Sequence, residues 1–126
     1  MKNTFATAIN CIDGRVQLPV RQWLIDNYSV DSVVKITAPG PDKLLHENQD
    51  IQVEVIKNNL KLSVETHEPV VVAVVGHYDC VANPVEKDVH LEQIKAAITT
   101  VKSWNFSINL VGLWVDDQWS VSEVNY

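Results

Sequence analysis

The run Pro69-Val-Val-Val-Ala-Val-Val-Gly76 is the most informative stretch of this 126-residue chain. A continuous apolar segment of this length is typical of a parallel β-strand that is buried on both faces of a sheet. A parallel strand has to be reached by a crossover connection, which is usually a helix. We therefore predict an α/β protein, a three-layer sandwich with helices on both faces of a central and mostly parallel sheet.

The segment before this run, Ile51–Thr66, is compatible with two structures. Ile51–Val55 and Leu60–Val64 alternate apolar and polar residues, like two strands of a hairpin around Lys57–Asn59. The apolar residues of the same segment can also form one face of a helix. Helix is favoured, since a hairpin would supply no crossover before the parallel strand. The residues of the helical face are Val53, Ile56, Leu60 and Val64.

The other predicted strands lie on both sides of the strand Pro69–Gly76. Strands are predicted over Thr4–Asn10, Ser32–Thr37 and Ile108–Val115, all rich in β-branched or apolar residues. Asp116–Gln118 forms a short turn, so Trp119–Val124 is predicted to be an antiparallel edge strand. The expected sheet has five strands in the order 2-1-3-4-5, of which the last is antiparallel.

Two further helices and one loop complete the predicted topology. Pro19–Tyr28 is predicted to be helical, with Pro19 at an early helix position. Ala38–Pro41 contains two prolines and a glycine, so we expect a fixed loop with neither strand nor helix. Asp88 is predicted to cap a third helix. The apolar stripe of that helix consists of Leu91, Ile94, Ile98, Val101 and Trp104.

Composition limits the classes of function. No repeat, low-complexity tract or linker-like segment divides the sequence, so we predict a single domain over residues 1–126. Sixteen acidic and ten basic residues give a net charge of −6, which argues against nucleic acid as a partner. The sequence lacks a signal-peptide core and any apolar run of the ~20 residues that cross a bilayer. We expect a cytoplasmic protein without a membrane partner.

Two cysteines and one histidine are expected to meet at one edge of the sheet. Cys11 follows the first predicted strand, and His77 and Cys80 follow the central strand. The predicted strand order makes the gap between these strands a topological switch point, where ligands bind. A lone cysteine or histidine is usually a packing residue, but two thiolates and an imidazole that converge suit Zn²⁺ and leave a fourth tetrahedral position open. A disulfide between the cysteines is not expected in a reducing compartment.

Two motifs resemble those of a known family. Cys11-Ile-Asp-Gly-Arg15 and Gly76-His-Tyr-Asp-Cys80 resemble the paired motifs Cys-x-Asp-Ser-Arg and Gly-His-x-x-Cys of β-class carbonic anhydrases. The resemblance implies the fold of that family and a zinc ion with a dyad beside it. The residues that it assigns are Cys11, His77 and Cys80 as zinc ligands, and Asp13 and Arg15 as the catalytic dyad.

Two single residues and one loop depart from the family pattern. Gly14 replaces the usual serine, and Val81 replaces the glycine that usually follows the second cysteine of the motifs. Ala38-Pro39-Gly40 takes the place of the family's Asn-Ala-Gly loop. Pocket walls and neighbouring groups can therefore differ from those of the family, so fold and zinc transfer better than substrate.

The activity that the resemblance implies is the reversible hydration of CO₂ to bicarbonate by zinc-bound hydroxide. Asp13 would orient the hydroxide, while Arg15 keeps Asp13 ionised. One alternative is hydrolysis of another small linear molecule, carbonyl sulfide or carbon disulfide. A second alternative is a non-catalytic zinc protein in which Asp13 fills the fourth position. The resemblance also implies a homodimer, for which four tryptophans and an edge strand offer apolar surface.

The remaining polar residues near the motifs receive no role. Tyr78 and Asp79 lie between two of the expected ligands, and they are as compatible with solvent exposure as with contact to the pocket. His46, His67 and His90 are expected at the surface, so none is assigned as a proton shuttle.

Overall fold

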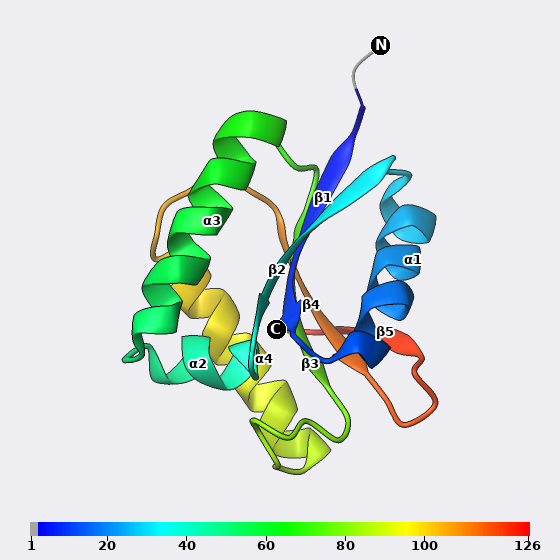
Figure 1. Cartoon of the computed structure of the whole chain (residues 1–126), viewed down its shortest axis with the longest axis vertical. Coiled ribbons are helices and arrows are strands. Elements are labelled where there is room, and N and C mark those ends of the chain that lie inside the picture. The colour runs from blue at the N-terminus through cyan, green and yellow to red at the C-terminus, as the bar shows by residue number, and fades with distance from the viewer. Residues whose placement is uncertain (1–2) are drawn as a thin grey trace.

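One five-stranded sheet forms the centre of the computed structural model, which describes residues 3–126. The strand order is β2-β1-β3-β4-β5, with parallel pairing throughout except between β4 and β5. This topology confirms the predicted sheet (Figure 1). The strands are β1 (Phe5–Cys11), β2 (Ser32–Ala38), β3 (Val72–His77), β4 (Leu110–Val115) and β5 (Val121–Val124).

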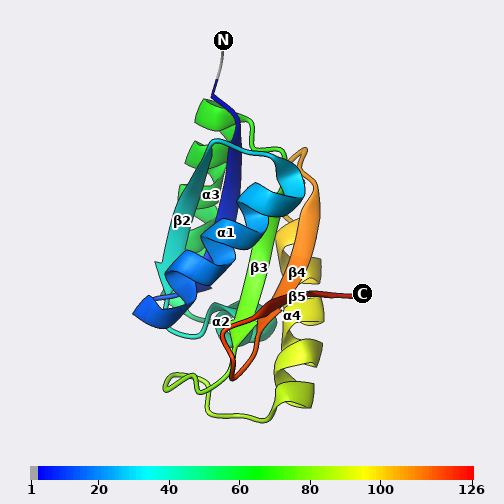
Figure 2. The ribbon, with the colours of Figure 1, turned by 90° about the vertical axis from the view of Figure 1, so that its right-hand side faces the viewer.

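Helices cover both faces of the sheet, as Figures 1 and 2 show. One face carries α1 (Gln17–Tyr28), which follows the 3-10 turn η1 (Gly14–Val16). The other face carries α2 (Pro41–Glu47), α3 (Ile51–His67) and α4 (Lys87–Lys102). The three-layer sandwich is confirmed, and α3 supplies the helix that the sequence favours over a hairpin. No helix within residues 3–126 is long and apolar enough to cross a membrane.

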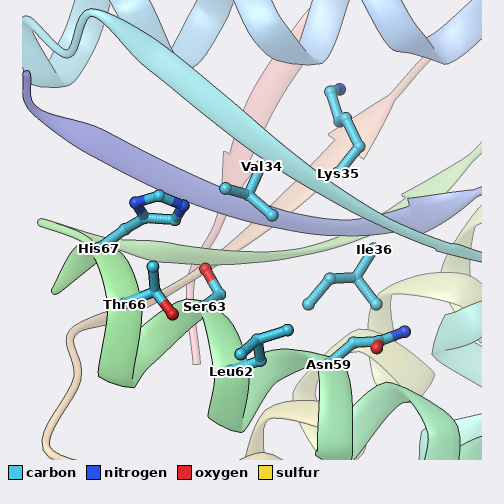
Figure 3. Close-up of a pocket in the computed structure, with 8 residues that line it drawn as sticks. All are labelled: Val34, Lys35, Ile36, Asn59, Leu62, Ser63, Thr66 and His67. Atoms are coloured by element: carbon cyan, nitrogen blue, oxygen red, sulfur yellow. The ribbon is translucent and has the colours of Figure 1, made fainter.

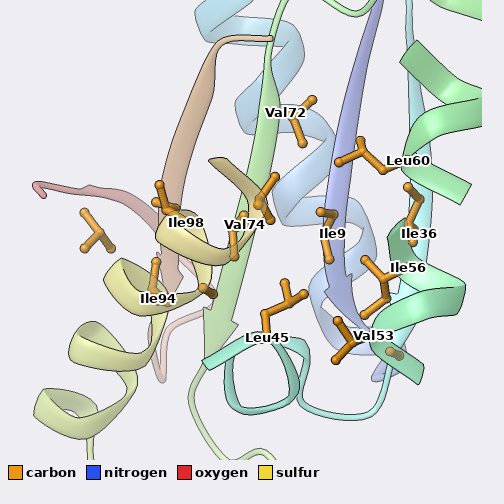
Figure 4. Close-up of a cluster of buried hydrophobic side chains, with 14 of the residues drawn as sticks. Ile9, Ile36, Leu45, Val53, Ile56, Leu60, Val72, Val74, Ile94 and Ile98 are labelled. Atoms are coloured by element: carbon orange, nitrogen blue, oxygen red, sulfur yellow. The ribbon is translucent and has the colours of Figure 1, made fainter. Parts of the chain in front are cut away.

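Each face of the sheet is packed by its own apolar cluster. Along β3, Val72 and Val74 face the cluster under α2, α3 and α4, whereas Ala73 and Val75 face the cluster under α1. Every residue of β3 is buried, which is the burial that the continuous apolar run predicts. Figure 4 shows the first cluster, whose labelled residues are Ile9, Ile36, Leu45, Val53, Ile56, Leu60, Val72, Val74, Ile94 and Ile98.

The short helix α2 corrects the prediction that the prolines exclude a helix. It begins at Pro41, and Gly40 before it has a left-handed φ of 57°. Proline is tolerated at the first helical position because its missing N–H would have no intrahelical partner there. The glycine makes the turn without a steric penalty. The loop between β2 and α2 is therefore shorter than expected, because β2 ends at Ala38 and α2 begins at Pro41.

Two further boundaries differ from the prediction. The cap of α4 is Glu86, so the prediction that Asp88 caps this helix is wrong. Asp88 lies in the first turn instead, where a negative charge still interacts favourably with the helix dipole. Trp119 belongs to the turn before β5 and not to the strand, and its φ is 57°.

Candidate metal centre

The ends of β1 and β3 bring the two motifs together. Cys11 is the last residue of β1, and His77 is the last residue of the neighbouring strand β3. Cys80 lies in the loop that follows. All three side chains are buried, and their ligand atoms lie within 4.8 Å of one another. The structure thus brings the three predicted ligands into one cluster that could hold a metal ion.

The distances and the chemistry of this cluster fit zinc. Cys11 Sγ and Cys80 Sγ are 3.9 Å apart. Two sulfurs that bind one tetrahedral zinc ion at ~2.3 Å would be about 3.8 Å apart. A set of two thiolates and an imidazole also binds zinc in preference to harder cations.

The histidine ring is oriented as a metal ligand requires. His77 Nδ1 lies 2.7 Å from the carbonyl oxygen of Tyr78, to which it can donate its proton. The lone pair is then on Nε2. This atom is buried, and within the described part of the chain it has no hydrogen-bond partner. A buried ring nitrogen that has no hydrogen-bond partner and belongs to a cluster with two sulfurs is the arrangement that a bound metal would satisfy.

The metal-free site shares its protons unequally between the two cysteines. The contact with the Cys80 thiol, assisted by His77 and against the effect of burial, lowers the pKa of Cys11 to about 3. The hydrogen bond to Cys11 and the burial of its own sulfur raise the pKa of Cys80 above its ordinary value. Burial opposes the charge on His77, but the Cys11 sulfur and the Tyr78 carbonyl together raise its pKa. Cys11 is therefore the thiolate, and Cys80 holds a proton that a metal must displace.

Asp13 and Arg15 form an ion pair at the mouth of the cluster. Arg15 Nη2 donates to Asp13 Oδ2 at 2.7 Å, and Arg15 Nε donates to Asp13 Oδ1 at 3.1 Å. The hydrogen bonds from Arg15 lower the pKa of Asp13 to about 2, against a small opposing effect of burial. Asp13 also accepts the backbone N–H of Arg15 at 2.9 Å and so begins η1. The short turn after β1 thus fixes the carboxylate beside Cys11.

Two residues without an assigned role hold Arg15 from the other side. Asp79 accepts Arg15 Nη1 at its carboxylate and Arg15 Nη2 at its carbonyl oxygen, both at 3.2 Å. The indole ring of Trp119 lies 4.5 Å from the centre of the guanidinium group. Asp79 and Trp119 both have a φ of 57°. The left-handed backbone of Trp119 is the costly one, because a bulky side chain rarely adopts it, whereas aspartate does so more readily.

The cluster leaves room for a fourth ligand. Among residues 3–126, the group that could hold a metal contains Cys11, His77 and Cys80 but no carboxylate. Both carboxylate oxygens of Asp13 accept hydrogen bonds from Arg15. A pocket of about 420 Å³ borders the site. It is lined by Cys11, Ile12, Asp13, Pro39, Val81 and Ala82.

His90 corrects the prediction that the other histidines are at the surface. It is 1% exposed, and His90 Nδ1 lies 2.6 Å from Oδ2 of the equally buried Asp42. His90 has the helical spacing of the buried residues Ile94, Ala97 and Val101 on α4. This spacing could have indicated its burial, but the predicted stripe contains apolar residues alone. His46 is exposed as predicted.

A second pocket lies away from the cluster, between β2 and α3 (Figure 3). Its volume is about 380 Å³. Ser63 and His67 of α3 point toward it, whereas Lys35 of β2 points to the opposite face of the sheet. None of its lining residues belongs to the metal-binding group found in residues 3–126. The candidate metal centre therefore lies at the ends of β1 and β3 and not in this pocket.

Comparison with known proteins gives the same fold. The β-carbonic anhydrase isoform I of Trichomonas vaginalis matches with a TM-score of 0.63 and 14% identity, over 94% of this chain and 81% of that one. A carbonic anhydrase from Glaciozyma antarctica matches with a TM-score of 0.58 and 14% identity, over 95% and 81%. Tetrameric β-carbonic anhydrases from Sordaria macrospora match with a TM-score of 0.56 and 13% identity, over 100% and 83%.

Sequence comparison supplies the family. No protein with a curated function matches this chain significantly. The profile of a family described as "Putative carbonic anhydrase" matches residues 1–125, which is nearly the whole chain. The family motifs in the sequence, the β-carbonic anhydrase fold and the Cys-His-Cys cluster agree with this match. The chain belongs to this carbonic anhydrase family.

Proposed function

We propose that this protein is a zinc-dependent carbonic anhydrase that hydrates CO₂ reversibly to bicarbonate. The main observation that supports this proposal is the buried cluster of Cys11, His77 and Cys80, in which His77 Nε2 has no hydrogen-bond partner among the described residues. These three side chains would hold the metal. Zinc, when bound, makes a water molecule nucleophilic near neutral pH.

The neighbouring residues support this chemistry. Asp13 is ionised at neutral pH because Arg15 lowers its pKa to about 2, so it accepts a hydrogen bond and does not donate one. From the pocket wall it would hold the hydrogen of the attacking water and turn the lone pair toward the substrate carbon. Ile12, Val81 and Ala82 supply apolar wall, which suits CO₂ because the molecule carries no net charge.

A non-catalytic zinc site is the weaker alternative. It would require Asp13 or another side chain to fill the fourth position permanently. Arg15 engages both carboxylate oxygens of Asp13, and among the described residues the metal-binding group includes no carboxylate. These contacts favour a position that stays open to water and substrate.

The test is stopped-flow CO₂ hydration by protein that holds about one zinc ion per chain, at several pH values. A Cys11→Ser variant is the matched control, because it keeps the size of the side chain but loses a soft ligand. We expect hydration that rises with pH and is absent in the control. A CO₂ hydration rate at alkaline pH that is no higher than that of buffer alone, with zinc fully bound, would reject the activity. It would leave hydrolysis of carbonyl sulfide or carbon disulfide, or a structural metal.

We further propose that the protein is a cytoplasmic homodimer built from a single domain, residues 1–126. Large apolar side chains that line the pocket beside the site are exposed, Ile12 at 62% and Val81 at 90%. Apolar residues of this kind favour association of subunits near the site. The net charge of −6 supports a protein that binds no nucleic acid. Sedimentation at several concentrations tests the dimer.

A further inference from the structure

One buried polar network lies beside two of the three segments that carry the proposed metal ligands, the end of β3 and the loop of Cys80. Asp42 lies in the first turn of α2, immediately after the turn at Gly40. A Cβ atom on Gly76, the residue before His77, would lie 2.7 Å from Asp42 Oδ2. Asn83 follows Cys80 in the loop before α4 and contacts Asp42. The network thus joins α2 to the end of β3 and to the loop that carries Cys80.

The hydrogen bonds of the network define its donors and acceptors. Asn83 Nδ2 donates to Gln93 Oε1 at 2.7 Å and to Asp42 Oδ1 at 3.2 Å. These bonds use both hydrogens of the amide. His90 Nδ1, which is 3.3 Å from Asn83 Nδ2, therefore donates its own hydrogen to Asp42 Oδ2 at 2.6 Å. Asp42 is the common acceptor of two buried donors from the Cys80 loop and from α4.

Asn83 is the anchor of the loop that carries Cys80. Within residues 81–89 it is the buried residue, at 1% exposure, and its neighbours in the sequence are exposed. No helix or strand spans residues 78–86. Beyond Tyr78, whose N–H donates to the Val115 carbonyl oxygen at 2.8 Å, no backbone–backbone hydrogen bond joins residues 79–85 to another element among the described residues. The side chain of Asn83 is therefore the main buried link between the loop and the body of the protein.

The backbone of Asn83 also contacts the Cys80 segment. The N–H of Asn83 donates to the Cys80 carbonyl oxygen at 3.2 Å. Gly40 lies against this loop, since a Cβ atom placed on it would be 3.2 Å from Asn83 Cβ. Gly40 follows the end of β2, where Ala38 is paired with Cys11 and accepts the N–H of Ile12 at 3.2 Å. Asn83 and Gly40 therefore link the Cys80 loop to the end of the sheet beside Cys11.

We propose that Asn83, fixed by Asp42 and Gln93, is a positioning residue that holds Cys80 at the distance from Cys11 that a shared metal ion requires. The proposal rests on the proposed zinc site, because it assigns a role toward the metal and not toward the fold alone. Removal of the amide frees the loop and costs metal affinity beyond any loss of stability. Outer groups that orient metal ligands typically contribute about 10-fold to 100-fold to metal affinity.

The experiment compares Asn83→Ala with Ser63→Ala. Ser63 forms a buried hydrogen bond of 2.7 Å with Thr7, which joins α3 to β1 and includes no residue of the Cys80 loop. The affinity of each purified, metal-free protein for Co²⁺ is measured by competition with a chelator, and the thiolate-to-cobalt absorption bands are recorded. We expect Asn83→Ala to bind Co²⁺ about 10-fold to 100-fold more weakly with altered bands. Ser63→Ala should lose stability but retain the affinity and the bands of the wild type.

Gln93→Leu provides a milder variant in case Asn83→Ala does not fold. It removes one acceptor of Asn83 from the half-buried face of α4, and a severalfold loss of Co²⁺ affinity is expected. Wild-type affinity and spectrum in these variants would overturn the proposal and leave the network a purely stabilising role. A wild-type chain that binds no Co²⁺ would overturn the proposed metal site and this inference with it. Tight binding without CO₂ hydration would reject the activity and leave the positioning role intact.

Discussion

Arg15 and His90 each pair with an aspartate beside the metal cluster, but their surroundings differ. Arg15 and Asp13 face solvent, with side chains 45% and 18% exposed. The side chains of His90 and Asp42 are each 2% exposed. We call the Arg15–Asp13 pair together with Asp79 the solvent side. We call the His90–Asp42 pair the interior side.

The difference separates two tasks. Exposed ion pairs contribute little to stability because water and salt screen them, so the solvent side is suited to aim Asp13 at a substrate. A buried pair that is fully hydrogen-bonded tolerates no loss of a partner, so the interior side is suited to fix the ligand geometry. The predictions below probe this division, beginning with the largest expected effect.

Removal of the common acceptor should break the interior side. In Asp42→Ala, both His90 Nδ1 and Asn83 Nδ2 lose a buried acceptor. We expect the free energy of unfolding to fall by about 3 kcal/mol, the cost typical of leaving a buried partner unpaired. Urea unfolding of the metal-free protein measures this, because bound metal would add its own stabilisation.

Asp79→Ala is the matched control on the solvent side. It removes a carboxylate that is 63% exposed and pairs with Arg15. We expect a much smaller change in the free energy of unfolding than for Asp42→Ala. Equal losses in the two variants would show that the two sides do not differ in the way described.

Metal binding should depend on pH because one of the ligands, Cys80, carries a proton in the metal-free protein. The pKa of Cys80 is raised by its contact with Cys11, so Cys80 keeps its proton at neutral pH in the metal-free protein. Metal binds the thiolate, so affinity rises as the pH rises and the proton is released. We expect an increase of about tenfold per pH unit above neutrality, and a steeper one below the raised pKa of His77. Chelator competition from pH 6 to 9 measures the slope, and a flat profile would contradict the unequal sharing of protons.

Two substitutions of Trp119 should separate backbone strain from the contact with Arg15. At a φ of 57°, Trp119→Gly should be more stable than Trp119→Ala by about 1 kcal/mol, because alanine keeps the left-handed penalty that glycine lacks. Both variants lose the ring that lies 4.5 Å from the guanidinium group. Both should therefore lower kcat/KM for CO₂ hydration equally, and by a few-fold.

Trp119→Phe is the control for this pair, since it keeps an aromatic face for Arg15 and should retain most of kcat/KM. Thermal unfolding measures the stability difference and stopped-flow assays measure the activity. A difference in activity between the glycine and alanine variants would show that the backbone, and not the ring, positions Arg15.

Much of the fold could be predicted because hydrophobic patterning reports burial directly. The run before His77 identifies a strand that is buried on both faces, and the need for a crossover identifies α3. The short helix α2 was less accessible, because Pro41 is compatible with a loop and with the first position of a helix. Tertiary packing, and not local propensity, decides between those two structures.

The candidate site divides in the same way. Cys11, His77 and Cys80 could be placed together because parallel strands end at one edge of a sheet. The contact of Arg15 with Trp119 could not be predicted, since it depends on a left-handed turn between two strands. The burial of His90 depends on Asp42, a partner far away in the sequence. Such contacts follow from the packed structure and leave no local pattern.

The 3.9 Å separation of the two sulfurs has a consequence for how the protein matures. Before metal arrives, Cys11 is a thiolate beside a thiol, which is the pairing that oxidants convert to a disulfide. Closing the gap to the ~2.05 Å of a disulfide would remove both ligands at once. Metal loading and oxidation therefore compete for the same two atoms after synthesis. The redox state of the compartment then decides how much of the protein is able to acquire its metal.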